Sequence, residues 1–379
     1  MRRFTFLVFL LFISKLVCAQ VNRYDRPAAA TFKNTYVSPD FNLIMKVLND
    51  KQAAYDQNRN YIDALINWIY ELKSQTNETQ FISSMDSYYK KLRSFDGEDL
   101  SVMSNQIRAV ELGIKEEIDK YNTRVKEANN PSKYWDAGIE NLKNNEYTSA
   151  IQNFSQVIQL SPDFAGSYLY RGIAYYYIDN ISVAINDLTK YIEMSPNDPE
   201  GFSHRGWAKY KQADFLGALK DFNKQIEFDP TSAIAYYNRG SAKSELKDEY
   251  GAISDYTRAI ETDPTFSMAY NNLGWAKFNL KKFREALVDV NKAIELDNTN
   301  YVAFDSRAEI KFNLNDYRGC IEDADMARRL NPDLGNSYLL KGRSYYRLGN
   351  KEAACINWSK AGELGKAEAY DYISKYCNN

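Results

Sequence analysis

The sequence contains a single histidine, His204, and only four cysteines among 379 residues. One histidine excludes metal sites built from paired imidazoles and the usual serine, histidine and aspartate triad. The sequence shows no phosphate-binding glycine loop and no nucleophile elbow, and carboxylates spaced four apart on helices ordinarily form solvated faces. His204 is interpreted as a solvated or groove-lining side chain. We therefore expect no enzyme, no metal site and no cofactor.

Long hydrophobic runs are absent after residue 19. No later stretch approaches the roughly 18 consecutive apolar residues that a membrane-spanning helix needs, so we expect no transmembrane segment. Residues 1–19 differ, because two arginines precede an apolar run over 4–17 and Ala19 stands before Gln20. This layout predicts a secretory signal peptide that is cleaved before Gln20. Lipidation of Cys18 is the alternative, which the large side chain preceding it disfavours.

The chain also has no surplus of positive charge. Residues 20–379 carry 45 basic and 50 acidic side chains, a net charge of −5. Binding to the phosphates of nucleic acid depends on clustered positive charge, so no nucleic-acid partner is expected. Tyrosine, in contrast, is abundant, with 30 residues. Because its ring is apolar and its hydroxyl is polar, tyrosine suits helical surfaces that are half exposed.

A period of 34 residues runs through the chain from residue 138 onward. Glycine recurs at this interval with one replacement by alanine, at Gly138, Gly172, Gly206, Gly240, Gly274, Ala308 and Gly342. A small residue lies twelve residues after each, at Ala150, Ala184, Ala218, Ala252, Ala286, Cys320 and Ala354. Proline closes five of the units, at Pro162, Pro196, Pro230, Pro264 and Pro332. Small residues let two helices approach closely and proline ends a helix, so each period predicts a pair of packed helices.

This pattern resembles the tetratricopeptide-repeat (TPR) family over residues 131–366. The resemblance implies an all-α fold, a right-handed superhelical solenoid of seven helix-turn-helix repeats. Residues 367–379 have apolar residues at helical spacing, and we expect a capping helix that covers the last apolar face. In the fourth repeat Tyr250 lies one residue later than the corresponding aromatic residues, which leaves Glu249 in their place. We expect a distorted turn there.

The part before the repeats has a different pattern. Residues 20–38 are polar and show no sustained period, which predicts a flexible arm. From Asp40 onward apolar residues recur at helical spacing, and two further amphipathic segments follow Asn77 and the turn at 96–97. Residues 39–130 are therefore predicted to form a helical bundle or hairpin docked on the first repeat. No functional family is recognisable in it.

An aromatic residue lies four positions before the glycine in all seven repeats, at Tyr134, Tyr168, Phe202, Tyr236, Tyr270, Phe304 and Tyr338. Residues four apart lie on one face of a helix. These aromatic residues are therefore predicted to form a buried seam that faces the second helix of each repeat.

Two rows of charged residues also follow the period. Cations precede the packing glycine or its substitute, and aspartates fall three residues after the small residue of the second helix. The rows are Arg171, Arg205, Arg239, Arg307 and Lys341, and Asp187, Asp221, Asp255, Asp289 and Asp323. They are interpreted as a ladder of bidentate ion pairs within the solenoid, because arginine suits partly buried pairing. A basic binding stripe is the alternative. The ladder predicts that Arg205→Ala lowers the melting temperature.

The resemblance further implies a concave surface, lined by the first helix of each repeat at positions three before, one after and four after the glycine. Most of these residues are aromatic, and as a row they predict a groove that binds a partner. The candidate groove residues are Trp135, Tyr176, Trp207, Tyr210, Tyr237, Asn271, Trp275, Phe278, Phe312, Arg343, Tyr346 and Arg347. For each of them, packing against the next repeat is the alternative. Asn271 and Asn272 alone resemble the family's carboxylate clamp, so a chaperone tail is not the favoured ligand.

Three cysteines lie in the repeats and the cap. Cys320 fills a small-residue packing position and is interpreted as a buried thiol. Cys355 and Cys377 lie on the last repeat and at the end of the capping helix. In an exported protein they are candidates for a disulfide that fixes the cap, and two free thiols are the alternative.

The function expected from these features is a non-catalytic scaffold or adaptor that holds a protein or peptide in the aromatic groove. A signal peptide with uninterrupted repeats is similar to many envelope TPR proteins of Gram-negative bacteria, which implies a periplasmic or cell-envelope location. Glycan or cell-wall binding is the alternative, because tryptophan and tyrosine rings also stack on sugars.

Overall fold

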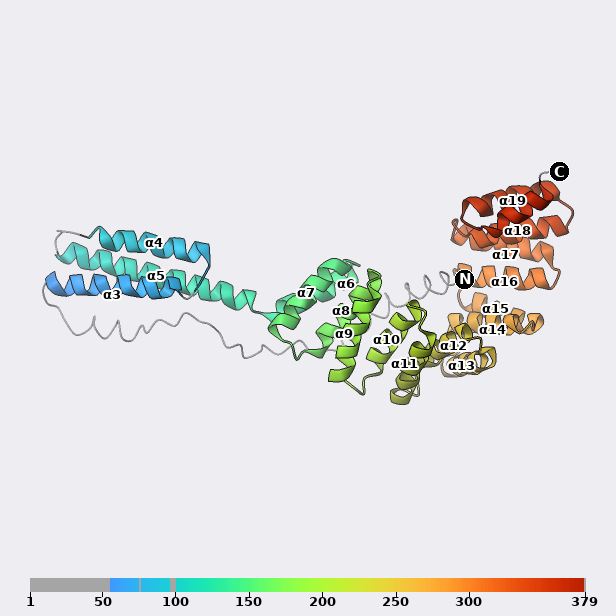
Figure 1. The fold of residues 1–379 in the computed structure, drawn as a ribbon, viewed down its shortest axis with the longest axis horizontal. Helices are drawn as coiled ribbons and strands as arrows, with labels where there is room; N and C mark the ends of the chain where they lie inside the picture. Colours follow the sequence, from blue (N-terminus) through green and yellow to red (C-terminus); the bar gives the residue numbers. More distant parts are fainter. Residues whose placement is uncertain (1–54, 75, 96–99, 378–379) are drawn as a thin grey trace. The chain divides into compact units, whose positions relative to one another are not determined.

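The structure, a computed structural model, describes residues 55–74, 76–95 and 100–377. Within these ranges it contains 18 α-helices and no strand (Figure 1), so the all-α fold class is confirmed. No described helix is both long enough and apolar enough to cross a membrane. The predictions of a signal peptide over 1–19, an arm over 20–38 and the first part of the following helix lie outside the described residues.

The chain divides into two compact units, one of which holds the first three described helices. These are α3 (Tyr55–Ser74), α4 (Thr79–Arg93) and α5 (Leu100–Ala128). All three contact one another around an apolar core, in which Leu65, Phe81 and Ile114 are completely buried. The described part of this region thus forms a bundle, one of the two predicted arrangements.

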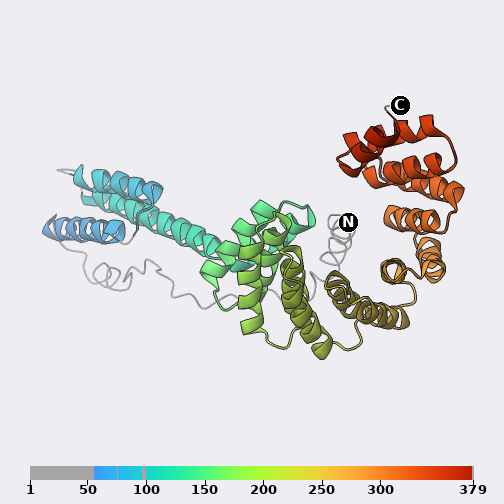
Figure 2. The same ribbon diagram turned by 45° about the vertical axis from the view of Figure 1, so that its right-hand side comes forward.

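The other unit holds the repeats from Gly138 onward. The seven helix pairs, named repeats 1 to 7, are α6 (Pro131–Lys143) with α7 (Tyr147–Leu160), α8 (Ala165–Tyr177) with α9 (Ile181–Met194), α10 (Pro199–Lys211) with α11 (Phe215–Phe228), α12 (Ala233–Glu245) with α13 (Glu249–Thr262), α14 (Ser267–Asn279) with α15 (Phe283–Leu296), α16 (Tyr301–Asn313) with α17 (Tyr317–Leu330), and α18 (Gly335–Arg347) with α19 (Lys351–Glu363). Each helix begins 34 residues after its counterpart in the preceding repeat. From α8 to α19 consecutive helices pack side by side, and the pairs follow a curved path (Figure 2).

The turn within each repeat contains one residue with positive φ, which lets the chain reverse between the two helices. These residues are Asn145, Asp179, Ala213, Lys247, Lys281, Asn315 and Gly349. In repeat 4, Lys247 has a φ of 68° and the side chain of Asp248 accepts from the backbone N–H of Gly251, as Asp214 does for Gly217 in repeat 3. The predicted distortion of this turn is therefore wrong. The left-handed residue and the N-cap set the turn, so an aromatic residue at its end is not required.

The two helices of a repeat meet at the periodic glycine, which faces the residue 16 positions later. A Cβ atom on Gly206 would lie 2.5 Å from Cε1 of Phe222, and one on Gly342 would lie 2.3 Å from Cδ1 of Trp358. In repeat 6 Ala308 takes the place of the glycine, and the residue 16 positions later is Ala324, which lies with it in one buried cluster. The glycines thus face larger side chains, whereas the one alanine faces another alanine.

The aromatic row four positions before the glycine is less buried than predicted. Only Phe202 and Phe304 are buried, whereas the other five residues are partly exposed. The guanidinium of the arginine three residues later lies over the ring in four repeats, for example 5.6 Å from the ring centroid of Tyr236 in the case of Arg239. One side of the aromatic row thus packs against the arginines of the ion-pair ladder, and the row does not form a closed buried seam.

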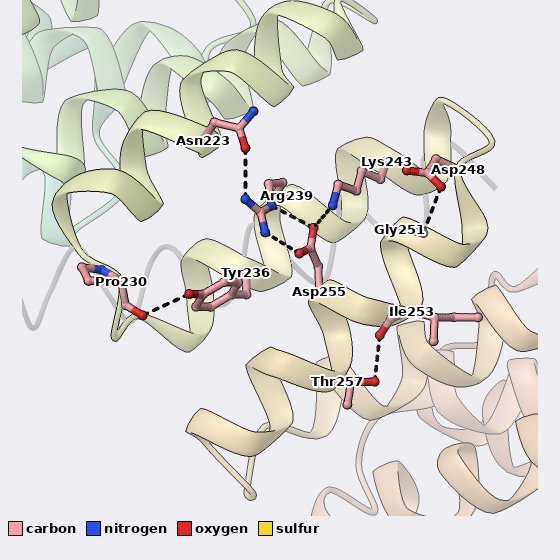
Figure 3. Close-up of polar contacts among 10 residues, drawn as sticks. All are labelled: Asn223, Pro230, Tyr236, Arg239, Lys243, Asp248, Gly251, Ile253, Asp255 and Thr257. Atoms are coloured by element: carbon pink, nitrogen blue, oxygen red, sulfur yellow. Dashed lines mark hydrogen bonds and ion pairs between the residues drawn. The ribbon is translucent and has the colours of Figure 1, made fainter.

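The predicted ladder is confirmed in four repeats, and Figure 3 shows the one in repeat 4. Nε and Nη2 of Arg239 donate to the two carboxylate oxygens of Asp255 at 2.9 and 2.6 Å. Nη1 donates to Oδ1 of Asn223 on α11 in the preceding repeat at 3.1 Å. Lys243 adds a second cation, 2.8 Å from Asp255, whose side chain is only 4% exposed. Each arginine thus joins both helices of its own repeat to the repeat before it.

The remaining two positions of the ladder use other partners. Leu273 replaces the arginine in repeat 5, and Asp289 there pairs with Lys277 at 2.7 Å. Lys341 in repeat 7 pairs with Asp325 of the preceding repeat at 2.7 Å. Since these cations are engaged with carboxylates within the solenoid, the alternative of a basic binding stripe has no support.

The capping helix α20 (Glu368–Tyr376) packs on α19 and closes the last repeat. Trp358 of α19 is completely buried, and the ring of Tyr372 stacks on it with centroids 4.9 Å apart. Cys355 on α19 and Cys377 after α20 form a disulfide. The cap is therefore held both by an aromatic cluster and by a covalent bond.

Replacing Cys377 with serine is expected to lower the free energy of unfolding by about 3 kcal/mol, because the bond closes a loop of 22 residues. Urea unfolding followed by circular dichroism measures this difference. Dithiothreitol should destabilise the native chain by a similar amount and leave the serine variant unchanged. Equal stability of the oxidised and reduced native chain would contradict a structural role for the bond.

Candidate functional site

A cavity of about 560 Å³ lies on the first helices of repeats 4 to 6, and we call it the polar groove. Most of its lining residues carry hydroxyl, amide or charged groups. They are Tyr210, Ser241, Ser244, Glu245, Lys247, Glu249, Tyr256, Asn271, Asn272, Trp275, Asn279, Val302, Asp305, Ser306, Glu309, Asn336 and Lys366. The predicted groove was aromatic, so its chemical character differs from the prediction.

The groove nevertheless occupies the positions that the repeat pattern indicates. In repeat 6 the positions three before and one after Ala308 hold Asp305 and Glu309, and both line the groove. In repeat 5 the same positions hold Asn271 and Trp275. The residues predicted to line the groove at these positions were mostly aromatic, and the two carboxylates were not among them, although the same spacing identifies them.

Three of the predicted groove residues, Tyr210, Asn271 and Trp275, line the polar groove. Among the others, five aromatic side chains are buried, namely Trp135, Tyr176, Trp207, Tyr237 and Phe312. For these five the structure favours the packing alternative, since their rings fill space between helices and have little free surface.

The four remaining predicted residues lie outside the lining. Phe278 is partly buried, with its ring stacked on Trp275 at a centroid distance of 4.7 Å. Arg343 lies 4.2 Å above the ring of Phe312 and pairs with Glu309 at 3.6 Å. Tyr346 and Arg347 are exposed near the end of α18. These four residues therefore do not line the groove, although Arg343 contacts it through Glu309.

Amide side chains form the middle of the groove. Asn271 is 6% exposed, and its Nδ2 donates to Oδ1 of Asn272 at 3.2 Å. Nδ2 of Asn272 in turn donates to the hydroxyl of Tyr237 at 3.2 Å. Within the described part of the chain, Oδ1 of Asn271 has no hydrogen-bond donor. An unpaired buried carbonyl costs about 1–3 kcal/mol, so this oxygen is a local cost to stability, and it is itself closed to the groove.

One wall of the groove carries Asp305 and Glu309, one helical turn apart on α16. Nδ2 of Asn336 and the hydroxyl of Ser337 donate to Asp305 at 2.7 and 2.9 Å. Burial raises the pKa of Asp305 above the ordinary aspartate value, although these two hydrogen bonds act in the opposite direction. Burial also raises the pKa of Glu309, and the nearby Arg343 lowers it in part. Both carboxylates are therefore held in a less solvated site than carboxylates on the surface.

The opposite wall carries a second carboxylate pair, Glu245 at the end of α12 and Glu249 at the start of α13. Glu245 accepts from the hydroxyl of Tyr210 at 3.3 Å. Glu249, which is 8% exposed, accepts from Ser244 at 3.1 Å and from Nδ2 of Asn279 at 2.7 Å. The substitution that was expected to distort the turn thus places a buried carboxylate at the groove.

The single histidine lies away from this groove. His204 lines a small cavity with Tyr176 and Trp207, and its Nε2 lies 3.6 Å from Glu200. Its side chain is 14% exposed, so His204 is only partly solvated, and it lines this small cavity instead of the polar groove. Cys320 is a buried thiol whose pKa burial raises to about 12. Among the described residues no three histidine, cysteine or acidic side chains are grouped to hold a metal ion.

Three segments of the chain match models of one repeat family. Residues 267–300 and 233–266 match models described as tetratricopeptide repeat, and residues 140–178 match one described as TPR repeat. The chain contains tetratricopeptide repeats. Among curated proteins, no sequence matches it significantly.

Solved structures support the same fold. A tetratricopeptide repeat protein from Parabacteroides merdae superposes with a TM-score of 0.55 and 16% identity, over 65% of this chain and 99% of that protein. PilF from Pseudomonas aeruginosa superposes with a TM-score of 0.50 and 18% identity, over 56% of this chain and 96% of its own. At these identities the similarity shows the fold alone, a TPR solenoid.

Proposed function

We propose that this TPR protein is a non-catalytic adaptor that holds an extended segment of a protein partner in the polar groove of repeats 4 to 6. TPR proteins generally mediate protein–protein interactions. The observation that carries the proposal is a cavity of about 560 Å³ that crosses three successive first helices and is lined by amide, hydroxyl and carboxylate groups. The backbone N–H groups of an extended segment can donate to such oxygens at regular spacing.

The proposed location is outside the cytoplasm, in the periplasm or at the cell envelope. Two arginines, an apolar run and Ala19 before Gln20 support export of the chain. The disulfide between Cys355 and Cys377 supports it as well, since such bonds persist in oxidising compartments.

A photo-crosslinking amino acid placed at Asn279 in the source cell tests both proposals. Asn279 lines the groove and is exposed, so a probe there should crosslink to a partner protein. The same probe at Glu261 on α13 is the control, because its side chain is 57% exposed and lies outside the groove lining. We expect a partner specific to Asn279, on a chain that begins at Gln20. Identical crosslinks from both positions would exclude the groove as the binding site, and a cytoplasmic chain with its first residues intact would exclude export.

No observation favours the glycan alternative. A ring that stacks on sugar needs an open face, and Trp207 is only 2% exposed. Trp275 is partly exposed, but its ring is stacked on Phe278.

A further inference from the structure

The charge of the polar groove is uneven. Among the described residues, its lining contains four carboxylates, Glu245, Glu249, Asp305 and Glu309, and two lysines, Lys247 and Lys366. Elsewhere in the repeats the buried aspartates are neutralised by arginine and lysine, as Asp255 is by Arg239 and Lys243. The groove therefore differs from the buried ion pairs of the ladder, because its acidic side chains outnumber its basic ones.

The carboxylates of the groove have few cationic partners of their own. In the described structure, Glu245, Glu249 and Asp305 accept hydrogen bonds from neutral groups, at Tyr210, Asn279 and Asn336 for example. No lysine or arginine forms an ion pair with these three within 4.0 Å among the described residues. Glu309 has one weak contact, 3.6 Å from Arg343. Buried carboxylates are stable when a cation is close. Cations from a partner would therefore stabilise the carboxylates of the groove.

We propose that the polar groove selects a partner segment that carries two lysine or arginine side chains, one for each carboxylate pair. This inference rests on the proposed function, because it specifies the segment that the groove receives. Glu245 and Glu249 would receive one cation, and Asp305 and Glu309 the other. Asn271 and Asn272, which lie between the two walls, would line the path of the same segment.

The spacing of the two cations follows from the packing of the first helices. α12 contacts α14, and α14 contacts α16. Packed helices lie about 8–10 Å apart, so the walls on α12 and α16 are separated by roughly 20 Å. An extended chain advances about 3.3 Å per residue. The two basic residues are therefore expected about six positions apart.

Phage display of random twelve-residue peptides against the purified chain tests the inference without prior choice of a sequence. We expect enrichment of peptides with two basic residues about six apart, which elute when the salt concentration is raised. The chosen peptides are then labelled, and their affinity is measured by fluorescence polarisation. Replacing both lysines or arginines of a peptide with glutamine should weaken its binding at least tenfold, since hydrogen bonds to charged groups are the strong ones.

The matched variant of the chain is Asp305→Asn with Glu309→Gln, which removes charge and keeps shape. We expect it to lose about tenfold in affinity for the basic peptides or more, with an unchanged circular dichroism spectrum. Glu261→Gln, on the exposed side of α13, should bind as the native chain does. The raised pKa of Asp305 and of Glu309 also predicts that affinity falls as the pH is lowered, starting above the range of ordinary carboxylates. The charged groups facing these two are Lys366, Arg343 and Glu368, besides each other.

Several results would overturn the inference. They are enrichment of acidic or apolar peptides, absence of any enrichment, and basic peptides whose affinity survives the double substitution. None of these results affects crosslinking from Asn279, which reports a partner whatever its charge. A partner crosslinked at Asn279 together with no preference for basic peptides would keep the proposed adaptor function and reject charge selection.

Discussion

Replacing Asp255 with alanine is expected to destabilise the repeats by about 3–5 kcal/mol, because it leaves two cations without their common buried partner. The carboxylate accepts two hydrogen bonds from Arg239 and lies 2.8 Å from Lys243, and its side chain is 4% exposed. The same arginine is bonded to Asn223 in the preceding repeat. When Arg239 loses the partner that orients it, the contact between repeats 3 and 4 is weakened as well as the contact between the two helices of repeat 4.

Urea unfolding measured by circular dichroism tests this expectation, with Glu261→Ala as the matched control on the same helix. Glu261 pairs with Arg258, but both side chains are 57% exposed, so the control should change the free energy of unfolding by less than about 1 kcal/mol. The double variant Arg239→Ala with Asp255→Ala should cost less than the sum of the single changes, because it removes the unpaired arginine. Equal effects of Asp255→Ala and Glu261→Ala would mean that the ladder does not stabilise the solenoid.

Much of the fold is readable from the sequence because a TPR solenoid is built from local contacts. The packing glycines, the paired helices and the ladder between Arg239 and Asp255 all depend on residues within one period, so their spacing predicts them. The bidentate geometry follows from the chemistry of arginine and aspartate. The bond from Arg239 to Asn223 was not predicted, because it joins two repeats and asparagine carries no charge that marks it as a partner.

The candidate site was less predictable because it also depends on contacts between repeats. Whether Trp207 faces solvent or a neighbouring helix depends on how closely first helices of successive repeats pack, which no single period contains. An aromatic side chain also fits both environments. Asp305 and Glu309 were the more informative residues at these positions, since carboxylates are rarely placed in a partly buried groove without a role.

The periodic glycine and its opposing residue are matched in size, so changing either one is expected to lower the free energy of unfolding. Phe222→Ala in repeat 3 is expected to cost about 3–5 kcal/mol, because the ring is completely buried against Gly206. Gly206→Ala alone is also expected to be destabilising, by about 1 kcal/mol, since the new Cβ atom would lie 2.5 Å from the Phe222 ring. The steric cost of about 1–3 kcal/mol exceeds the gain in helix propensity.

Combining the two changes should reverse the sign of the second. In the Phe222→Ala background the ring is gone, so Gly206→Ala fills part of the cavity and adds a better helix former, which stabilises the chain by about 1 kcal/mol. The combination reproduces repeat 6, where Ala308 and Ala324 lie in one buried cluster. Ala308→Gly should accordingly be destabilising by about 1 kcal/mol. Urea unfolding of the four variants measures these differences. If Gly206→Ala destabilised the chain equally in both backgrounds, the close approach to residue 222 would not explain why the period requires glycine.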